Sequence, residues 1–354
     1  MQRYRLFKQL ALSYALKFVG RWMIEQFQNI SEEGILENTE NLPELAATSG
    51  GLKAFSTFLV AEGIEDCRKC CGGHGYLLAS GVAALSADYV WQTTAEGDYT
   101  VLILQTARFL LRSFIKAQQG TPFPSGPMQY FSVLTEKNFR LESAKPPAIK
   151  TVDELLDPKY LHSLFQFRAL AAVLSLGTSM QESEKKDGLN FDEAFSANAL
   201  QARDAVKAHC FAFLVSMFAA ELAKVQDQTL AKPLSSLLAM LCLSNILDDN
   251  WAPFGVMDVK LTALVRRGIV RVMDDIRPNC VALVDAFDFP DRVLNSVLGN
   301  YDGNVYEAIM EHSISSSLNR TDPFDGYKEH IQPLLDMDLM RHGNKPHANL
   351  PSNL

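Results

Sequence analysis

Apolar side chains recur every three or four residues along nearly the whole chain, which is the spacing that places them on one face of an α-helix. The first segment shows this with an apolar face of Phe7, Leu10, Ala11, Tyr14, Ala15, Phe18, Val19 and Trp22. Further helices are predicted near 42–71, 97–116, 151–181, 188–228, 231–248, 257–275, 279–286, 303–313 and 324–336. The sequence shows no convincing strand alternation, so we predict an all-α fold.

Prolines and glycines cluster between residues 116 and 150, where the helical pattern stops. Both residue types disfavour a continuing helix, so we expect a linker over 119–150. The predicted order is a helical bundle over 1–118, this linker, a second helical bundle over 151–336 and a polar tail over 337–354.

The composition restricts the classes of function. The chain has 354 residues and a net charge of −8, which argues against nucleic acid as a partner, because proteins that bind it present basic surfaces. The six cysteines do not form the framework typical of disulfide-rich secreted domains, and a reducing compartment fits them best. The longest uncharged apolar run, 233–247, is shorter than the roughly 20 residues that cross a bilayer, so we expect no membrane span.

The stretch CRKCCGGHGY, residues 67–76, carries three cysteines and a histidine at helical spacing. A structural zinc needs four ligands that converge tetrahedrally, usually from two chain segments. Ligands along one straight helix face cannot surround an ion, and the sequence has no second CxxC, so we expect no metal site. A redox role is disfavoured because no predicted strand precedes CRKC. We interpret the thiols as small buried groups at a helix end.

The glycines of this stretch are more informative than its cysteines. Gly72 and Gly73 follow a long predicted helix and permit the backbone conformations that end one. Backbone N–H groups exposed at such a helix end suit an anionic group such as a phosphate.

A second motif, TTAEGDYTVLILQTARFL at 93–110, places Glu96 just before Gly97 and at the start of an apolar helix. Such a carboxylate has two ordinary roles, as a first-turn residue favoured by the helix dipole or as part of a helix cap. The functional alternative is a catalytic base in a pocket lined by apolar residues.

Taken together, CGGHGY and AEGDYTVLILQTARFL closely resemble the acyl-CoA oxidases, which are relatives of the acyl-CoA dehydrogenases. Residues 5–23, 42–55 and 63–76 are similar to helices of the family's flavin domain, and 277–310 is similar to the signature of its C-terminal domain. The resemblance covers about residues 1–335. Family members begin with a helical domain and a β domain that have no counterpart here, so the chain resembles the C-terminal half of the usual protein.

The resemblance implies an FAD-dependent oxidase that converts a fatty acyl-CoA to the trans-2-enoyl-CoA and reduces O2 to hydrogen peroxide, the first step of peroxisomal fatty acid β-oxidation. It implies that Glu96 is the base that removes the C2 proton. It also implies a homodimer in which part of the site meets the flavin of the partner subunit. The implied cofactor contacts are Gly72, Gly73, His74, Gly97 and Asp98.

Two positions depart from the family pattern. Ala95 stands where an aromatic residue is common, and Tyr99 replaces the usual asparagine. Both are expected to affect the acyl pocket without removing the base. The last residues, Ser352, Asn353 and Leu354, resemble a peroxisomal import signal that a receptor reads. The alternative to an active oxidase is a truncated, non-catalytic dimerisation module.

Overall fold

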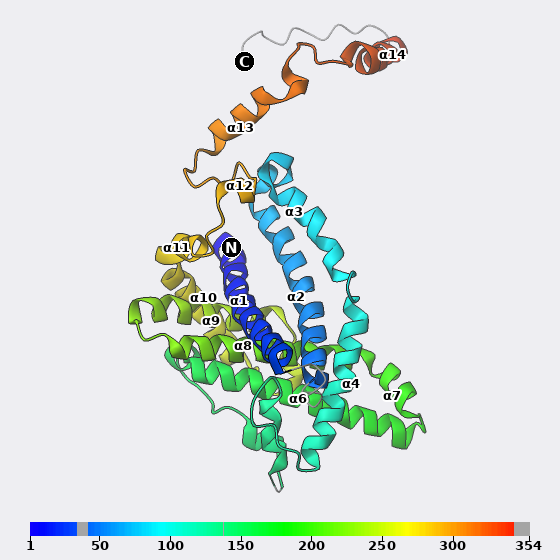
Figure 1. Ribbon diagram of the computed structural model, residues 1–354, viewed down its shortest axis with the longest axis vertical. Helices are drawn as coiled ribbons and strands as arrows, with labels where there is room; N and C mark the ends of the chain where they lie inside the picture. The colour runs from blue at the N-terminus through cyan, green and yellow to red at the C-terminus, as the bar shows by residue number, and fades with distance from the viewer. Residues whose placement is uncertain (34–41, 137, 343–354) are drawn as a thin grey trace. The chain divides into compact units, whose positions relative to one another are not determined.

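The computed structural model describes residues 1–33, 42–136 and 138–342 (Figure 1). These residues contain helices and connections and no strand, which confirms the all-α prediction. The helices of the first half are α1 (Gln2–Glu33), α2 (Leu42–Cys70), α3 (Val82–Tyr89), α4 (Tyr99–Gln118), α5 (Val152–Leu155) and α6 (Pro158–Lys186). Those of the second half are α7 (Phe191–Ala197), α8 (Ala199–Lys224), α9 (Gln228–Asp248), α10 (Val259–Ile276), α11 (Cys280–Asp285), α12 (Asp291–Leu294), α13 (Val305–Ser315) and α14 (Gln332–His342). The predicted import signal at 352–354 lies outside the described residues.

Two helices predicted as continuous are each divided. The helix expected over 151–181 forms α5 and α6, because Pro158 disfavours helical backbone in the residue before it. Asp157 instead caps α6 by accepting a hydrogen bond from the N–H of Lys159 (2.9 Å). The helix expected over 188–228 is interrupted at Asn198, which ends α7 and precedes α8.

The described chain divides into two compact units. The first comprises Met1–Tyr76 and Val82–Phe289, and the second comprises Leu77–Gly81 with the chain from Pro290 onward. Within the second unit, the N–H of Val297 donates to the carbonyl of Ala79 (3.0 Å), which ties the short inserted segment to the chain after α12.

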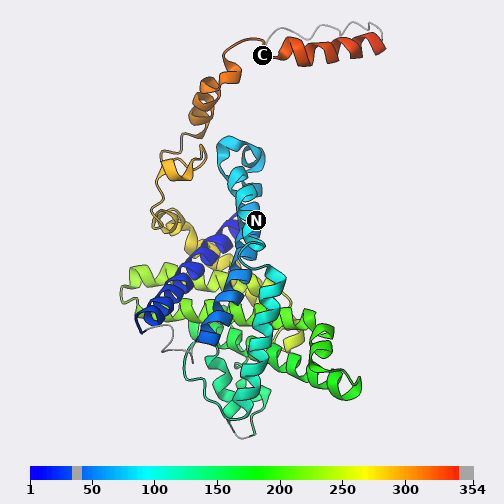
Figure 2. The same ribbon diagram turned by 45° about the vertical axis from the view of Figure 1, so that its right-hand side comes forward.

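The core of the first unit is built from both predicted helical blocks. Helices α6 and α8 pack together, α2 lies beside α4, and α1 contacts both α8 and α9 (Figures 1 and 2). Aromatic rings join α1 to α8, with Trp22 against Phe213 (4.9 Å between centroids) and Phe18 against Phe218 (5.1 Å). The two blocks therefore share one hydrophobic core.

The described residues of the segment expected as a linker, 119–150, contain no α-helix but are packed against this core. It includes the 3₁₀ helix η4 (Gln129–Thr135), and Met128, Tyr130 and Phe131 are buried. Apolar side chains among its prolines thus anchor the connection. Its place as a domain boundary stays a prediction.

Helices α8 and α9 are long and apolar enough to cross a membrane by length and composition alone. Both lie in the core of the first unit, where α8 contacts α1, α4 and α6, and α9 contacts α1 and α10. Contacts with neighbouring helices account for their apolar side chains, and we interpret both as core helices.

One ion pair is buried in this core. The side chain of Arg168 is 4% exposed, and its Nη2 donates to Oδ2 of Asp249 at 2.6 Å. Its Nη1 donates to Oδ1 of Asn245 at 2.8 Å, and the guanidinium lies 4.5 Å from the ring centroid of Trp251. Burial by itself would raise the pKa of Asp249, but the guanidinium outweighs it and holds that pKa below its usual value.

Candidate functional site

A tight turn carries Glu96 from the helical segment after α3 into α4. Glu96 has φ of 56° and Gly97 has φ of 117°. The left-handed region is uncommon for a residue other than glycine and costs on the order of 1–3 kcal/mol. A Cβ on Gly97 would lie 2.6 Å from Cδ1 of Leu102. The turn therefore places two consecutive residues at positive φ. Glycine occupies the second of these positions, where there is no room for a side chain.

Asp98 caps the helix that follows this turn. Its Oδ1 accepts hydrogen bonds from the N–H groups of Thr100 (2.9 Å) and Val101 (3.2 Å). A cap of this kind contributes about 1 kcal/mol. The sequence left open whether Glu96 is the capping carboxylate, and the structure gives that role to Asp98. A cofactor contact of Asp98 stays a prediction.

The Glu96 carboxylate is exposed. Within the described part of the chain it forms no ion pair and no side-chain hydrogen bond. The N–H of Ala95 donates to the carbonyl of Trp91 (3.0 Å), whereas no acceptor among the described residues takes the N–H of Glu96. The turn thus presents the Glu96 carboxylate and the Glu96 N–H, neither of which forms a hydrogen bond with a described residue.

Lys53 of α2 contacts this turn and was not singled out by the sequence analysis. Its Nζ donates to the carbonyls of Gln92 (2.8 Å), Ala95 (2.6 Å) and Gly97 (2.5 Å). The sequence holds one indication of this contact. Lys53 is the single charged residue of GLKAF, and its apolar neighbours Leu52 and Phe55 are buried.

The other predicted site residues lie at the far end of α2. The helix ends at Cys70, and Gly72 adopts φ of 60°, as expected for a glycine that terminates a helix. Gly72 and Gly73 are exposed, and a Cβ added to either would meet nothing within 4 Å. His74 is half-buried. Space is therefore open beside the two glycines.

Gly75 is the glycine of this stretch that the packing requires, although it is not among the predicted cofactor contacts. It is buried, and a Cβ there would lie 2.1 Å from the carbonyl oxygen of Arg68. The short 3₁₀ helix η1 (Gly72–Tyr76) can therefore fold back against the end of α2 only with glycine at this position.

The cysteines of this stretch are half-buried, and not fully buried as predicted. Burial raises the pKa of Cys67 to about 11 and also raises the pKa of Cys70. The Sγ of Cys71 donates to the carbonyl of Cys67 at 3.4 Å. A protonated thiol is a poor nucleophile and a poor metal ligand. Across residues 1–33, 42–136 and 138–342, no group of three or more His, Cys, Asp or Glu is arranged to hold a metal.

The two predicted parts of the site do not converge within one chain. Lys53, which contacts the Glu96 turn, and Cys70, which precedes Gly72, are 17 residues apart on α2 (70 − 53). At 1.5 Å per residue that is about 25 Å of helix. One chain thus offers an exposed carboxylate at one place and open space beside two glycines at another.

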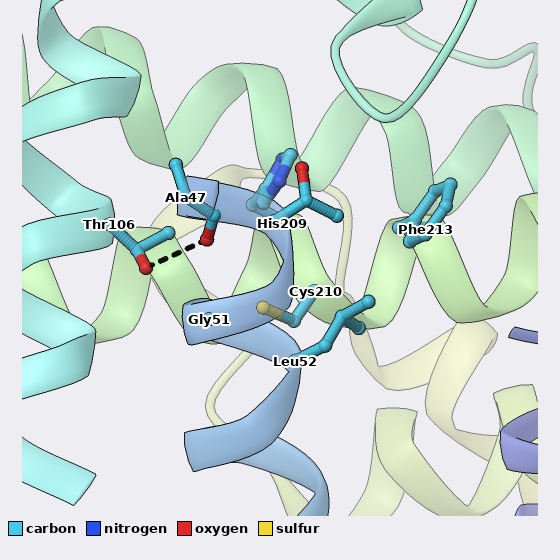
Figure 3. Close-up of a pocket in the computed structure, with 8 residues that line it drawn as sticks. Ala47, Gly51, Leu52, Thr106, His209, Cys210 and Phe213 are labelled. Atoms are coloured by element: carbon cyan, nitrogen blue, oxygen red, sulfur yellow. Dashed lines mark hydrogen bonds between the residues drawn. The ribbon is translucent and has the colours of Figure 1, made fainter. Parts of the chain in front are cut away.

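A buried pocket lies between α2, α4 and α8 (Figure 3). The hydroxyl of Thr106 donates to the carbonyl of Ala47 at 3.2 Å, and Cys210 and Phe213 line the opposite side. The pocket has no room for a water molecule. We therefore interpret it as a packing void of the core and not as a ligand site.

His209, beside this void, is a neutral buried histidine. Its Nδ1 lies 2.9 Å from the hydroxyl of Tyr130, and burial lowers the pKa of His209 to about 4. Burial also raises the pKa of Tyr130 well above its usual value. Both groups therefore stay uncharged at neutral pH, and the Tyr130 hydroxyl and Nδ1 of His209 share one hydrogen bond.

This histidine predicts a loss of stability in acid. Because its pKa is lower in the folded chain than in the unfolded chain, only the unfolded chain gains a proton between pH 6.5 and about 4. The free energy of unfolding should fall as the pH decreases through this window. We expect His209→Gln to remove roughly 2 kcal/mol of the loss between pH 7 and pH 4.5, measured by urea unfolding. An unchanged pH dependence in His209→Gln would contradict the assignment.

Comparison with known proteins gives a consistent result over nearly the whole chain. Residues 157–336 match the acyl-CoA oxidase family, and residues 1–111 match the acyl-CoA oxidase C-alpha1 domain. Peroxisomal acyl-coenzyme A oxidase 1 of Cavia porcellus is 35% identical over 335 residues, and the human protein of that name is 34% identical over 336. Each match covers 94% of this chain and 50% of the relative, so the chain spans about half the length of these relatives.

The solved structures that resemble this chain are also acyl-CoA oxidases. Arabidopsis thaliana acyl-CoA oxidase 1 is 33% identical with a TM-score of 0.85, over 96% of this chain and 50% of that one. Acyl-CoA oxidase-1 of Caenorhabditis elegans, solved with FAD and ATP, is 28% identical with a TM-score of 0.83, over 95% of this chain and 50% of that one.

Proposed function

The chain belongs to the acyl-CoA oxidase family, and from this we propose that it oxidises fatty acyl-CoA to the trans-2-enoyl-CoA with O2 as the electron acceptor. The observation that carries the proposal is Glu96, an exposed carboxylate without a protein partner among the described residues, on a turn of fixed geometry. We propose the peroxisome as its location, as in the names of its relatives. The import receptor would read Ser352, Asn353 and Leu354, which lie outside the described residues.

Glu96 would act as the base that takes the proton from C2 of the acyl group. A proton next to a thioester is weakly acidic, so the base has to lie within hydrogen-bond reach of it and away from water. In the chain by itself the carboxylate is exposed. The bound acyl-CoA, the cofactor and further protein would therefore exclude water from it.

The charge that develops on the thioester oxygen needs a donor aimed at it. The N–H of Glu96 has no acceptor among the described residues and is suited to this role. FAD, when bound, supplies the acceptor for the hydride that leaves C3 and passes the electrons to O2, which yields hydrogen peroxide. Gly97 and Asp98 would lie near that cofactor. Ala95 and Tyr99, next to the base, would influence which acyl chains fit.

A homodimer would complete the site. Gly72, Gly73 and His74 lie too far from the Glu96 turn to serve the same end of one flavin within one chain. We propose that they contact the flavin held mainly by the partner subunit. Open space beside the two glycines is compatible with a phosphate at their N–H groups.

The second candidate is a non-catalytic dimerisation module. The observation in its favour is that the Glu96 carboxylate is exposed and that its turn lies far from Gly72 along α2. In this role the chain would pair with complete oxidase subunits through its helical surface and would hold no flavin by itself.

The absorption spectrum of the purified protein separates these two functions. An oxidase should show the flavin band after incubation with FAD and gel filtration. It should then produce peroxide and enoyl-CoA in equal amounts from a saturated fatty acyl-CoA. If no flavin is retained and no peroxide forms, the catalytic proposal fails for this chain. Co-purification of the flavin-free chain with a complete oxidase would then favour the dimerisation module.

A further inference from the structure

We propose that Lys53 is a positioning residue that holds the Glu96 turn in its left-handed conformation. The ammonium of Lys53 reaches from α2 to three carbonyls of one short segment, at 2.8 Å (Gln92), 2.6 Å (Ala95) and 2.5 Å (Gly97). Two of these carbonyls belong to the residues on either side of Glu96. The contacts themselves do not depend on the proposed function, and only their catalytic consequence rests on it.

The chemistry of the ammonium matches this arrangement of carbonyls. An ammonium group has three N–H donors and no acceptor, so three carbonyls satisfy it fully. Lys53 is half-buried, and no carboxylate of the described residues forms an ion pair with it. Hydrogen bonds from a charged donor are stronger than those between neutral groups. The positive charge of Lys53 is thus balanced by backbone dipoles of this turn and by no acidic side chain.

The turn needs such a restraint because its backbone is strained. A non-glycine residue at φ of 56° persists only where the surrounding structure imposes it. Asp98 fixes the end of the turn that enters α4. Lys53 fixes the start of the turn, where the chain leaves the helical segment that precedes Glu96. The backbone of Lys53 lies in α2, which packs beside α4. The direction of the Glu96 side chain is therefore set from α2, by a residue that would not itself touch the substrate.

Proteolysis of the chain tests the restraint without any enzymatic activity. A glutamate-specific protease cleaves the Glu96–Gly97 bond only when the turn opens. We expect Lys53→Met to increase the cleavage rate at this bond at least tenfold, and Lys53→Arg to increase it less. Cleavage after Glu142, an exposed residue in another connection, should not change. Lys185→Met removes an exposed lysine and serves as the matched control.

Two results of the proteolysis experiment would overturn the proposal. The first is a cleavage rate after Glu96 in Lys53→Met within twofold of the parent rate. The second is an equal increase at Glu96 and Glu142, which would make Lys53 a general stabiliser and not a restraint on this turn.

Kinetics of the flavin-loaded protein test the consequence for catalysis. Misplacing the base should lower kcat of Lys53→Met about 100-fold while KM stays within threefold of the parent value. Lys53→Arg should recover at least tenfold of kcat. If kcat of Lys53→Met is unchanged while the turn opens, the positioning role is wrong. If the parent chain has no turnover at all, the proposed function fails while the protease result still decides whether Lys53 holds the turn.

Discussion

Replacing Glu96 with glutamine should lower turnover of acyl-CoA by at least about 10³-fold, within the range that a positioned acid–base group contributes. Glutamine has nearly the shape of glutamate but cannot accept the C2 proton. The exposed carboxylate forms no side-chain hydrogen bond and no ion pair among the described residues, so its loss should not disturb the fold. The flavin should therefore remain bound while peroxide production and substrate-dependent bleaching of the flavin band are lost.

Glu142→Gln is the matched control, because it makes the same change at an exposed carboxylate in another connection. Its turnover should equal that of the parent. Turnover of Glu96→Gln within tenfold of the parent, with full flavin content, would remove Glu96 from the role of base. Loss of flavin along with turnover would instead mean that the residue serves the cofactor site.

Replacing Asp249 with alanine should lower the free energy of unfolding by about 3–5 kcal/mol, because it leaves a buried guanidinium without its counter-ion. The Arg168 side chain is 4% exposed and depends on Asp249 for its one ion pair among the described residues. Urea unfolding followed by circular dichroism measures the change. Asp274→Ala is the control, since it breaks an exposed pair with Arg3 and should cost no more than about 1 kcal/mol.

A double replacement keeps this prediction testable if Asp249→Ala does not fold. Arg168→Met with Asp249→Leu removes both charges together, and apolar replacement of a whole buried pair is often nearly neutral. The double variant should therefore be more stable than Asp249→Ala. Because the folded pKa of Asp249 lies below its unfolded value, the pair stabilises the fold above about pH 4 and loses that contribution as the pH falls through the folded pKa. A double variant no more stable than the single one would contradict this account.

The positions of the candidate site residues could be found from the sequence to different degrees. Glu96 and Gly97 stand out because a short motif carries both the carboxylate and the glycine that the turn needs. Lys53 does not stand out, because its role depends on carbonyls that lie 39 to 44 residues further along the chain. A lysine beside buried apolar residues signals that something satisfies its charge, but it does not say which carbonyls do so.

The linker predicted over 119–150 also shows that a local sequence pattern does not specify contacts with distant residues. The described residues of this segment contain no α-helix, as expected from prolines and glycines, which act locally on the backbone. They carry no information on whether the segment packs against a core. Tyr130 reaches His209, 79 residues further along the chain, and no local pattern specifies that pairing.

The sequence by itself determined the all-α class, most helix positions, the end of α2 just before Gly72 and the family to which the chain belongs. These follow from apolar periodicity, local backbone preference and motifs, which are written in consecutive residues. Only the tertiary structure decided that both helical blocks share one core, that Lys53 contacts the Glu96 turn, and that this turn and Gly72 lie at separate places along α2. Those features arise from contacts between residues far apart in the chain, and such contacts form when helices bury their apolar faces together.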